Sequence, residues 1–260
     1  MTSLISGGLA IEMERINAAI RAEPLKADHR LALARLKLVQ GDYAKALQQF
    51  QLACRFDAEL AAEAQLARML VRAEQLREAV FAGKILPDLL AAAPRWLENM
   101  IAALREEGDK AAALRRSALS EAPASKGHYS NPELTPFEWI ADGDERLGPV
   151  LEIIMGESYY WIPFDQVESL SIQPPARAMD LVWASVDLKL AGRPPFVAFM
   201  PSRYLPPSEG ATEAMLTGAE TIWHELPGGN WIGSGRRVWM ADGEPLSLFE
   251  AGSIVLDAGA

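Results

Sequence analysis

Residues 39–60 read "VQGDYAKALQQFQLACRFDAEL" and place a glycine–aspartate turn directly before an amphipathic helical pattern. After the turn the apolar residues recur at the three- and four-residue spacing of one helix face, and they are Ala46, Leu47, Phe50, Ala53 and Cys54. Asp42 stands where its side chain can cap the first turn of this helix, and Asp57 falls where the helix should end. The stretch therefore predicts one helix of a helical hairpin that turns at Gly41.

Helical periodicity continues on both sides of this hairpin. Further apolar helix faces occupy residues 9–20, 31–39, 60–71 and 76–83. The segment "EGDKAAALRRSALSEAP" at 107–123 repeats the Gly-Asp turn 67 residues after the first, which is about two tetratricopeptide repeat lengths. We predict two to three tetratricopeptide-like (TPR-like) hairpins, and a non-repetitive helical bundle is the alternative.

The pattern changes after residues 121–136, "EAPASKGHYSNPELTP", whose prolines, glycine and small polar residues are typical of a linker. Beyond it, residues 180–192 alternate with a period of two, as a strand does. Two hairpins are predicted, with turns at Gly156-Glu157 and at Asp242-Gly243. The large tryptophans of these blocks are expected in the core, and they are Trp139, Trp161 and Trp183.

These patterns predict an α+β fold with two domains. Residues 1–125 form TPR-like helical hairpins, and residues 126–260 form an antiparallel β domain with a small barrel-like sheet. The charge supports the division, because the first part holds 17 basic and 16 acidic residues and the second holds 8 and 19, for net charges of +1 and −11. Neither part has the concentrated positive charge that nucleic acid requires, so we expect no nucleic-acid partner.

Location and chemistry are constrained mainly by what the sequence lacks. No run of about 18 apolar residues occurs, so membrane insertion is not expected, and the single Cys54 fits a reducing cytoplasm.

The three histidines stand far apart, and the HExxH zinc pattern after His224 fails because residue 228 is glycine. No glycine-rich segment opens a helix as a phosphate loop does. We therefore predict no catalytic residue, no cofactor and no metal.

An acidic turn, "WIADGDERLGPVLE" at 139–152, also fails as a calcium loop. Counted from Asp142, the sixth and twelfth positions should be glycine and glutamate, but they are Leu147 and Ile153. We expect a solvated acidic turn instead.

Several ungapped blocks resemble one family. They are "REAVFAG" (77–83), "PFEWIADGDERLGPVLE" (136–152), "YYWIPFDQV" (159–167), "PPARAMDLVW" (174–183), "PSRY" (201–204) and "GSGRR" (233–237). In this order they resemble the ImpE family, also called SciE or TagJ, of accessory proteins in type VI secretion clusters. The resemblance runs from about residue 10 to residue 250.

This resemblance implies a cytoplasmic, non-enzymatic protein that binds the N-terminal helix of the small contractile-sheath subunit. Through that subunit it would be linked to the AAA+ ATPase that recycles the sheath. A general TPR co-chaperone or scaffold is the main alternative, and an enzyme that binds a small ligand is another.

We expect the sheath helix to be short and amphipathic and to lie in a groove with apolar anchors at i, i+3, i+4 and i+7. One possible surface is the concave face of the helices, near Arg30, Arg35 and Lys37; the other is the acidic β half, which we favour because its charge would attract a basic helix. The residues proposed for partner binding are Asp142, Asp144, Glu145, Trp223, Trp231, Arg236 and Arg237.

Overall fold

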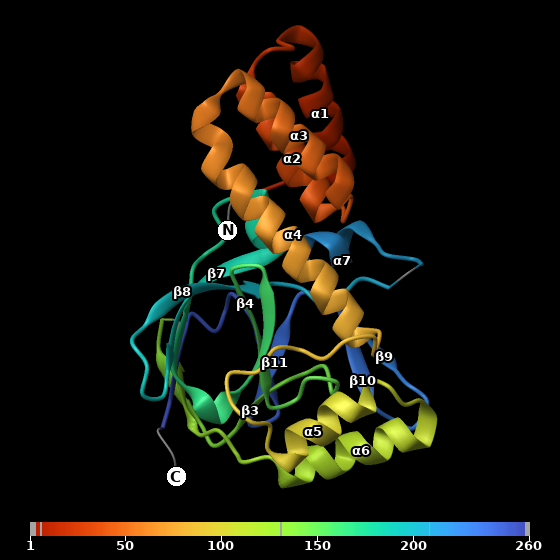
Figure 1. The fold of residues 1–260 in the computed structure, drawn as a ribbon, viewed down its shortest axis with the longest axis vertical. Coiled ribbons are helices and arrows are strands. Elements are labelled where there is room, and N and C mark those ends of the chain that lie inside the picture. Colours follow the sequence, from red (N-terminus) through yellow and green to blue (C-terminus); the bar gives the residue numbers. More distant parts are fainter. Residues whose placement is uncertain (1–3, 6, 131, 208, 258–260) are drawn as a thin grey trace.

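The computed structural model describes residues 4–5, 7–130, 132–207 and 209–257, and it has the predicted α+β fold (Figure 1). Six α-helices precede the first strand in these residues: α1 (Leu9–Ala22), α2 (Ala27–Val39), α3 (Tyr43–Phe56), α4 (Ala61–Phe81), α5 (Arg95–Ala103) and α6 (Gly108–Glu121). None of the described helices is long and apolar enough to cross a membrane.

The hairpin predicted from residues 39–60 is formed by α2 and α3. Gly41 turns the chain with a φ of +76°, which a side chain disfavours. The Asp42 side chain then caps α3 by accepting a hydrogen bond from the Lys45 amide at 3.3 Å. Phe50 is fully buried between the helices. Local turn chemistry and one apolar face are therefore enough to specify this pair.

Helix α4 departs from the expected pattern. The two apolar faces at 60–71 and 76–83 belong to one continuous helix of 21 residues rather than to separate helices. Neither glycine nor proline interrupts the sequence between them, so nothing in the chain favours a turn there. The result is a helix about 30 Å long that runs from the α1–α3 end of the molecule onto the side of the β half (Figure 1).

Thirteen strands follow in the described residues: β1 (Gly127–Ser130), β2 (Leu134–Phe137), β3 (Ile140–Asp142), β4 (Val150–Met155), β5 (Ser158–Pro163), β6 (Val167–Ile172), β7 (Trp183–Leu190), β8 (Phe196–Pro201), β9 (Thr221–Glu225), β10 (Trp231–Gly235), β11 (Val238–Ala241), β12 (Glu244–Ser247) and β13 (Ser253–Leu256). A short helix, α7 (Glu213–Thr217), lies between β8 and β9. Both predicted hairpins form, as β4–β5 and as β11–β12.

All strand pairs between these elements are antiparallel, and they form three sheets. The largest has eight strands in the order β2-β1-β13-β6-β7-β8-β4-β5, and a three-stranded sheet has the order β12-β11-β3. Their facing side chains make one apolar core. The third sheet is the β9–β10 hairpin. Strand β1 and most of β2 lie within residues 121–136, so part of the expected linker is built into the main sheet.

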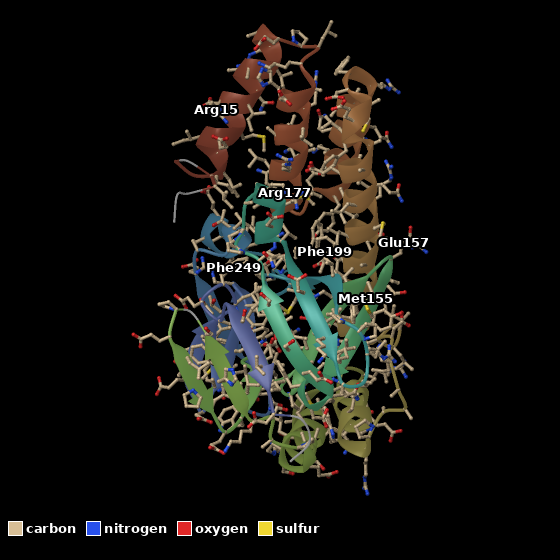
Figure 2. The ribbon with its side chains drawn as sticks, turned by 90° about the vertical axis from the view of Figure 1, so that its left-hand side faces the viewer. Arg15, Met155, Glu157, Arg177, Phe199 and Phe249 are labelled. Carbon is tan, nitrogen blue, oxygen red and sulfur yellow. The ribbon has the colours of Figure 1, made fainter. Side chains whose placement is uncertain are left out.

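The helices lie at two ends of the β half. Helices α1–α3 cover one end, α5 and α6 pack against the other, and α4 connects them (Figure 1). The β4–β5 turn, with Met155 and Glu157, lies beside α4 (Figure 2), where Arg72 Nε is 3.1 Å from Glu157 Oε2. A Cβ on Gly148 would come within 2.5 Å of Leu119, which shows how closely α6 contacts the β half. Helices α5 and α6 therefore pack with the second half of the chain, although the sequence places them in the first.

Two of the three tryptophans expected in the core are there. Trp161 is fully buried and Trp183 is 1% exposed, with its ring 6.1 Å from that of Tyr43. The prediction is wrong for Trp139, which is 40% exposed. It lies at the corner between β2 and β3, where its neighbours Phe137 and Ile140 point into the core instead.

Candidate partner-binding groove

A cluster of buried charges joins α4 to the β half. It contains four arginines and four acids, and we call it the charge cluster: Arg77, Arg146, Arg203 and Arg237 with Glu74, Asp142, Asp144 and Glu152. Its members have equal formal charges of each sign. Buried charges are costly unless they are paired, so the equality indicates an internally neutralised unit.

Glu152 of β4 is the centre of the cluster and is fully buried. Arg77 of α4 donates to it from Nε at 2.6 Å, and Arg237 and the Tyr159 hydroxyl also contact it. Burial alone would raise the pKa of Glu152, but the charges of Arg237 and Arg77 outweigh burial and hold this pKa at about 2. Glu152 is therefore ionised and fixed between two guanidinium groups.

Asp142 competes for one of the same arginines. Burial raises the pKa of Asp142 to about 6, although Arg237 opposes the rise, and the neighbouring Asp144 adds to it. The Tyr204 hydroxyl is 2.8 Å from Asp142 Oδ1 and 2.8 Å from the Val238 carbonyl oxygen. Arg237 thus forms ion pairs with both Asp142 and Glu152. Of these two carboxyl groups, Glu152 has the lower pKa and loses its proton first.

The cluster also reaches into the helices. Arg77 donates to Glu74 of the same helix at 2.8 Å, and Trp183 donates from Nε1 to Glu74 at 2.9 Å. Arg203 donates to the Val39 carbonyl oxygen at 2.7 Å, at the C-terminal end of α2, where a positive charge is favoured. These contacts bind α2 and α4 to the sheet.

The acidic turn is not solvated, contrary to expectation. Asp142 is 4% exposed and Asp144 is fully buried. Their charges are neutralised by arginines, with Arg237 at Asp142 and Arg146 paired to both Asp144 oxygens at 2.9 and 2.5 Å. Arg146 is part of the turn itself, but the sequence alone did not show that Arg237, 95 residues from Asp142, returns to it. Only Glu145 remains half-buried, and it accepts from the Asn230 side chain at 2.5 Å.

The seven residues proposed for partner binding do not form one surface. Asp142, Asp144 and Arg237 lie inside the charge cluster. Trp223 is half-buried against Tyr204, with ring centroids 5.7 Å apart, while Trp231 is 44% exposed. Arg236 is half-buried and lines a separate cavity of about 580 Å³, near Glu213 of α7. Four of the seven can therefore meet a partner: Glu145, Trp223, Trp231 and Arg236.

Two adjoining cavities beside the end of α4 form a surface that sequence analysis missed. The first holds about 610 Å³ and the second about 530 Å³, and both are lined by Phe81 and Arg146. Helices α5–α6 and the β9–β10 turn bound the first cavity, while the β8–α7 loop and β10 bound the second. We call the two together the groove.

The floor of the groove is largely apolar. Besides Phe81 it presents Leu104, Ala111, Leu205, Pro206, Pro207, Leu226, Pro227 and Ile232. The Arg146 guanidinium lies 4.6 Å from the centre of the Phe81 ring, a cation–π contact that holds the ring in place from the cluster side. Acidic residues also line the cavities, namely Glu78, Glu106 and Glu107. The groove thus offers an apolar strip beside negative charge.

The helical surface considered as the alternative is less free. Arg35 is paired through both Nε and Nη2 to Glu63 at 2.7 Å, and Arg30 donates to Gln49 at 3.3 Å. Lys37 donates to Gln40 at 2.8 Å.

No group of three or more His, Cys, Asp or Glu side chains in the described part of the chain is placed to hold a metal ion.

Comparison with known proteins agrees with the fold. A family model described as "ImpE protein" matches residues 135–255. A crystal structure of protein VPA1032 from Vibrio parahaemolyticus superposes with a TM-score of 0.84 and 20% identity, covering 96% of this chain and 94% of that one. The type VI secretion system accessory component TagJ of Pseudomonas aeruginosa is 33% identical over 251 residues, covering 95% of this chain and 87% of that protein. At this identity over nearly the whole length of both proteins, the chain belongs to the ImpE family that includes TagJ.

Proposed function

We propose that this protein is a non-enzymatic, cytoplasmic accessory component of a type VI secretion system that binds the N-terminal amphipathic helix of the small sheath subunit. The observation that carries the proposal is the groove, because two adjoining apolar cavities that share Phe81 suit a helix with a continuous apolar stripe. The family relationship to TagJ supports the secretion context. By holding the sheath helix, the protein would modulate sheath assembly or its recycling by the AAA+ ATPase.

Charge supports the same partner. The second half of the chain has a net charge of −11, and Glu78, Glu106 and Glu107 line the groove. A helix with basic residues beside its apolar stripe would associate faster at low salt, and Glu78, which forms no ion pair within the described residues, would attract those basic residues. These three acids belong to the first half of the chain, while the second half contributes apolar lining residues such as Leu205 and Ile232 and its overall negative charge.

The charge cluster supports a structural role better than a catalytic one. Glu152 is held by two arginines and a tyrosine, and Asp144 by Arg146, so both carboxylates are committed to internal partners. A carboxylate clamp of the co-chaperone type would need unpaired basic side chains on the helices, whereas Arg35 is paired with Glu63. Both facts favour the groove over the alternatives.

Calorimetry with the full-length protein and a synthetic peptide of the sheath N-terminal helix tests the proposal. Replacing Leu226 in the first cavity, as Leu226→Ser, should weaken binding about 10-fold, because a contacting leucine side chain contributes on the order of 1.5 kcal/mol or more. The matched control is Val197→Ser on β8, which is 65% exposed and outside the groove, and which should change the Kd less than about 2-fold.

The intact chain is required for this test. A division at residue 125 would separate Arg77 from Glu152 and α5–α6 from the β half. Failure of the intact protein to bind the peptide would refute the proposed function. Equal losses from Leu226→Ser and Val197→Ser would refute the groove as the site.

A further inference from the structure

The groove contains polar groups that lack a partner. In the described residues, four buried side-chain nitrogen atoms have no hydrogen-bond partner, and two of them belong to groove residues: Arg115 Nε in the first cavity and His224 Nε2 in the second. A buried donor without a hydrogen-bond partner destabilises the folded protein. A ligand that supplies an acceptor at that position therefore binds more tightly.

Arg115 is the stronger of the two signals. It is 5% exposed, and its other nitrogens make only long hydrogen bonds, 3.3 Å to the Ala103 carbonyl oxygen and 3.4 Å to Asn230 Oδ1. None of the described carboxylates pairs with it. The first cavity therefore contains a buried positive charge whose hydrogen-bonding capacity is incompletely used.

The neighbouring charges do not cancel this one. Arg146 is already paired with Asp144. Glu106 is paired with Lys110 at 2.7 Å, and Glu107 is an exposed residue that screens weakly through water. Asp144 and Glu145 also act on the charge of Arg115, but neither carboxylate forms an ion pair with its guanidinium, so Arg115 has no direct counter-ion among the described residues in the first cavity.

The side chains that line the second cavity carry a negative charge. Glu78 of α4 lines it with an exposed carboxylate that has no hydrogen bond or ion pair within the described residues. Its remaining charged lining residue, Arg146, is shared with the first cavity and neutralised by Asp144. His224 adds a nitrogen that can donate or accept, depending on its tautomer.

We propose that the groove binds its helix in one direction only, with the helix N-terminus at Glu78 and the C-terminus at Arg115. This proposal rests on the proposed function. A helix carries about half a positive charge at its N-terminus and half a negative charge at its C-terminus, where the last carbonyl groups lack partners. Glu78 would accept from first-turn N–H groups, and Arg115 would donate to last-turn carbonyl groups or to an acidic side chain there.

The direction has a consequence for assembly. Because the bound helix is the N-terminal segment of the sheath subunit, the rest of the subunit continues from the helix C-terminus. It would then leave the groove at the α5–α6 end, away from α1–α3 (Figure 1). Helices α1–α3 would then not contact the rest of the sheath subunit.

Paramagnetic labelling of the full-length protein tests the direction. In a Cys54→Ala background, which removes the one native cysteine, a nitroxide is attached through Glu107→Cys beside the first cavity or through Pro206→Cys beside the second. NMR of an isotope-labelled sheath peptide should show stronger broadening of its C-terminal residues by the label at 107 and of its N-terminal residues by the label at 206. The reverse pattern, or equal broadening of both ends, would overturn the direction.

Charge variants test its physical basis. Glu78→Gln should weaken peptide binding about 2- to 5-fold, as expected for a charge near a helix terminus, while Glu14→Gln on the exposed face of α1 should leave binding unchanged. Arg115→Met should weaken binding more than Arg115→Lys, and melting curves of both show whether the fold is kept. Unchanged affinity in Glu78→Gln would overturn the proposal. Absence of any binding by the unmodified protein would instead refute the proposed function, and the direction would fall with it.

Discussion

The α2–α3 hairpin and the junction between α4 and the sheet both contain fully buried side chains, but of different kinds. The hairpin buries small and apolar side chains such as Ala46, Phe50 and Ala53. The junction buries the charged Arg77 and Glu152 in addition to apolar rings such as those of Trp161 and Trp183. When apolar side chains are truncated, the free energy of unfolding falls with the volume removed. When one partner of a buried ion pair is removed, the other charge stays buried without a counter-charge, and the loss is large at once. The attachment of the helices to the sheet therefore depends on a few charged residues as well as on apolar packing.

The largest expected effect comes from removing the central carboxylate. Glu152→Gln leaves Arg77 and Arg237 buried with one counter-charge fewer, which should lower the free energy of unfolding by about 3–5 kcal/mol. Urea unfolding of the full-length protein measures this loss. The matched control, Glu157→Gln, breaks the exposed pair with Arg72 and should cost less than about 1 kcal/mol. Similar losses for the two variants would contradict the special role of the junction.

A tryptophan replacement tests aromatic packing at the same junction together with one hydrogen bond to the charge cluster. Trp183→Ala removes a large buried ring beside Tyr43 and one hydrogen bond to Glu74, so it should cost about 3–5 kcal/mol. Trp139→Ala, at a position 40% exposed, should cost about 1 kcal/mol or less. Unchanged melting of Trp183→Ala would show that the junction does not need this ring.

The pH dependence of stability should differ between the cluster's two central acids. Because the pKa of Glu152 is lowered to about 2 in the folded protein, its carboxylate stabilises the fold above pH 4.5, and this contribution of about 3 kcal/mol is lost as the pH falls toward 2. The pKa of Asp142 is raised to about 6, so its ionisation lowers stability as the pH rises through 6. Carboxyl NMR titration measures both values directly. A Glu152 titration near pH 4.5 in the folded protein would contradict the proposed pairing.

The sequence predicted what local patterns determine. Gly41 and Asp42 are sufficient to place the α2–α3 turn, and the two-residue period is sufficient to place β7. The continuous length of α4 was not predicted, because two successive apolar faces do not by themselves show whether a turn separates them. Trp139 was misplaced because its residue type was used without its position at a strand corner.

The charge cluster could not be predicted from local patterns, because Arg77 and Glu152 are 75 residues apart. A weak signal was present, since Glu152 stands in the apolar run "VLEIIM" at a strand position where a solvent-facing residue would also be polar. Its burial depends on α4 covering that face of β4. The groove was missed for the same reason: Phe81, Leu205 and Ile232 come from separate segments of the chain, and only the tertiary fold brings them together.

The smallest predicted effect concerns two neighbouring residues on β10. Successive side chains of a strand point to opposite faces, so Ile232 lines the groove while Trp231 points away from it and is 44% exposed. Trp231 is a sequence-based candidate for partner binding, and its replacement tests whether the outer face of the β9–β10 hairpin also contacts the sheath helix. We expect Ile232→Ala to weaken peptide binding about 5-fold, because it removes apolar contact area, and Trp231→Ala to weaken it less than about 2-fold. Calorimetry of both full-length variants, with melting curves to confirm that each is folded, measures the difference. A larger loss from Trp231→Ala would move the docking surface to the outer face, where Glu145 accepts a hydrogen bond from the Trp231 amide at 3.2 Å.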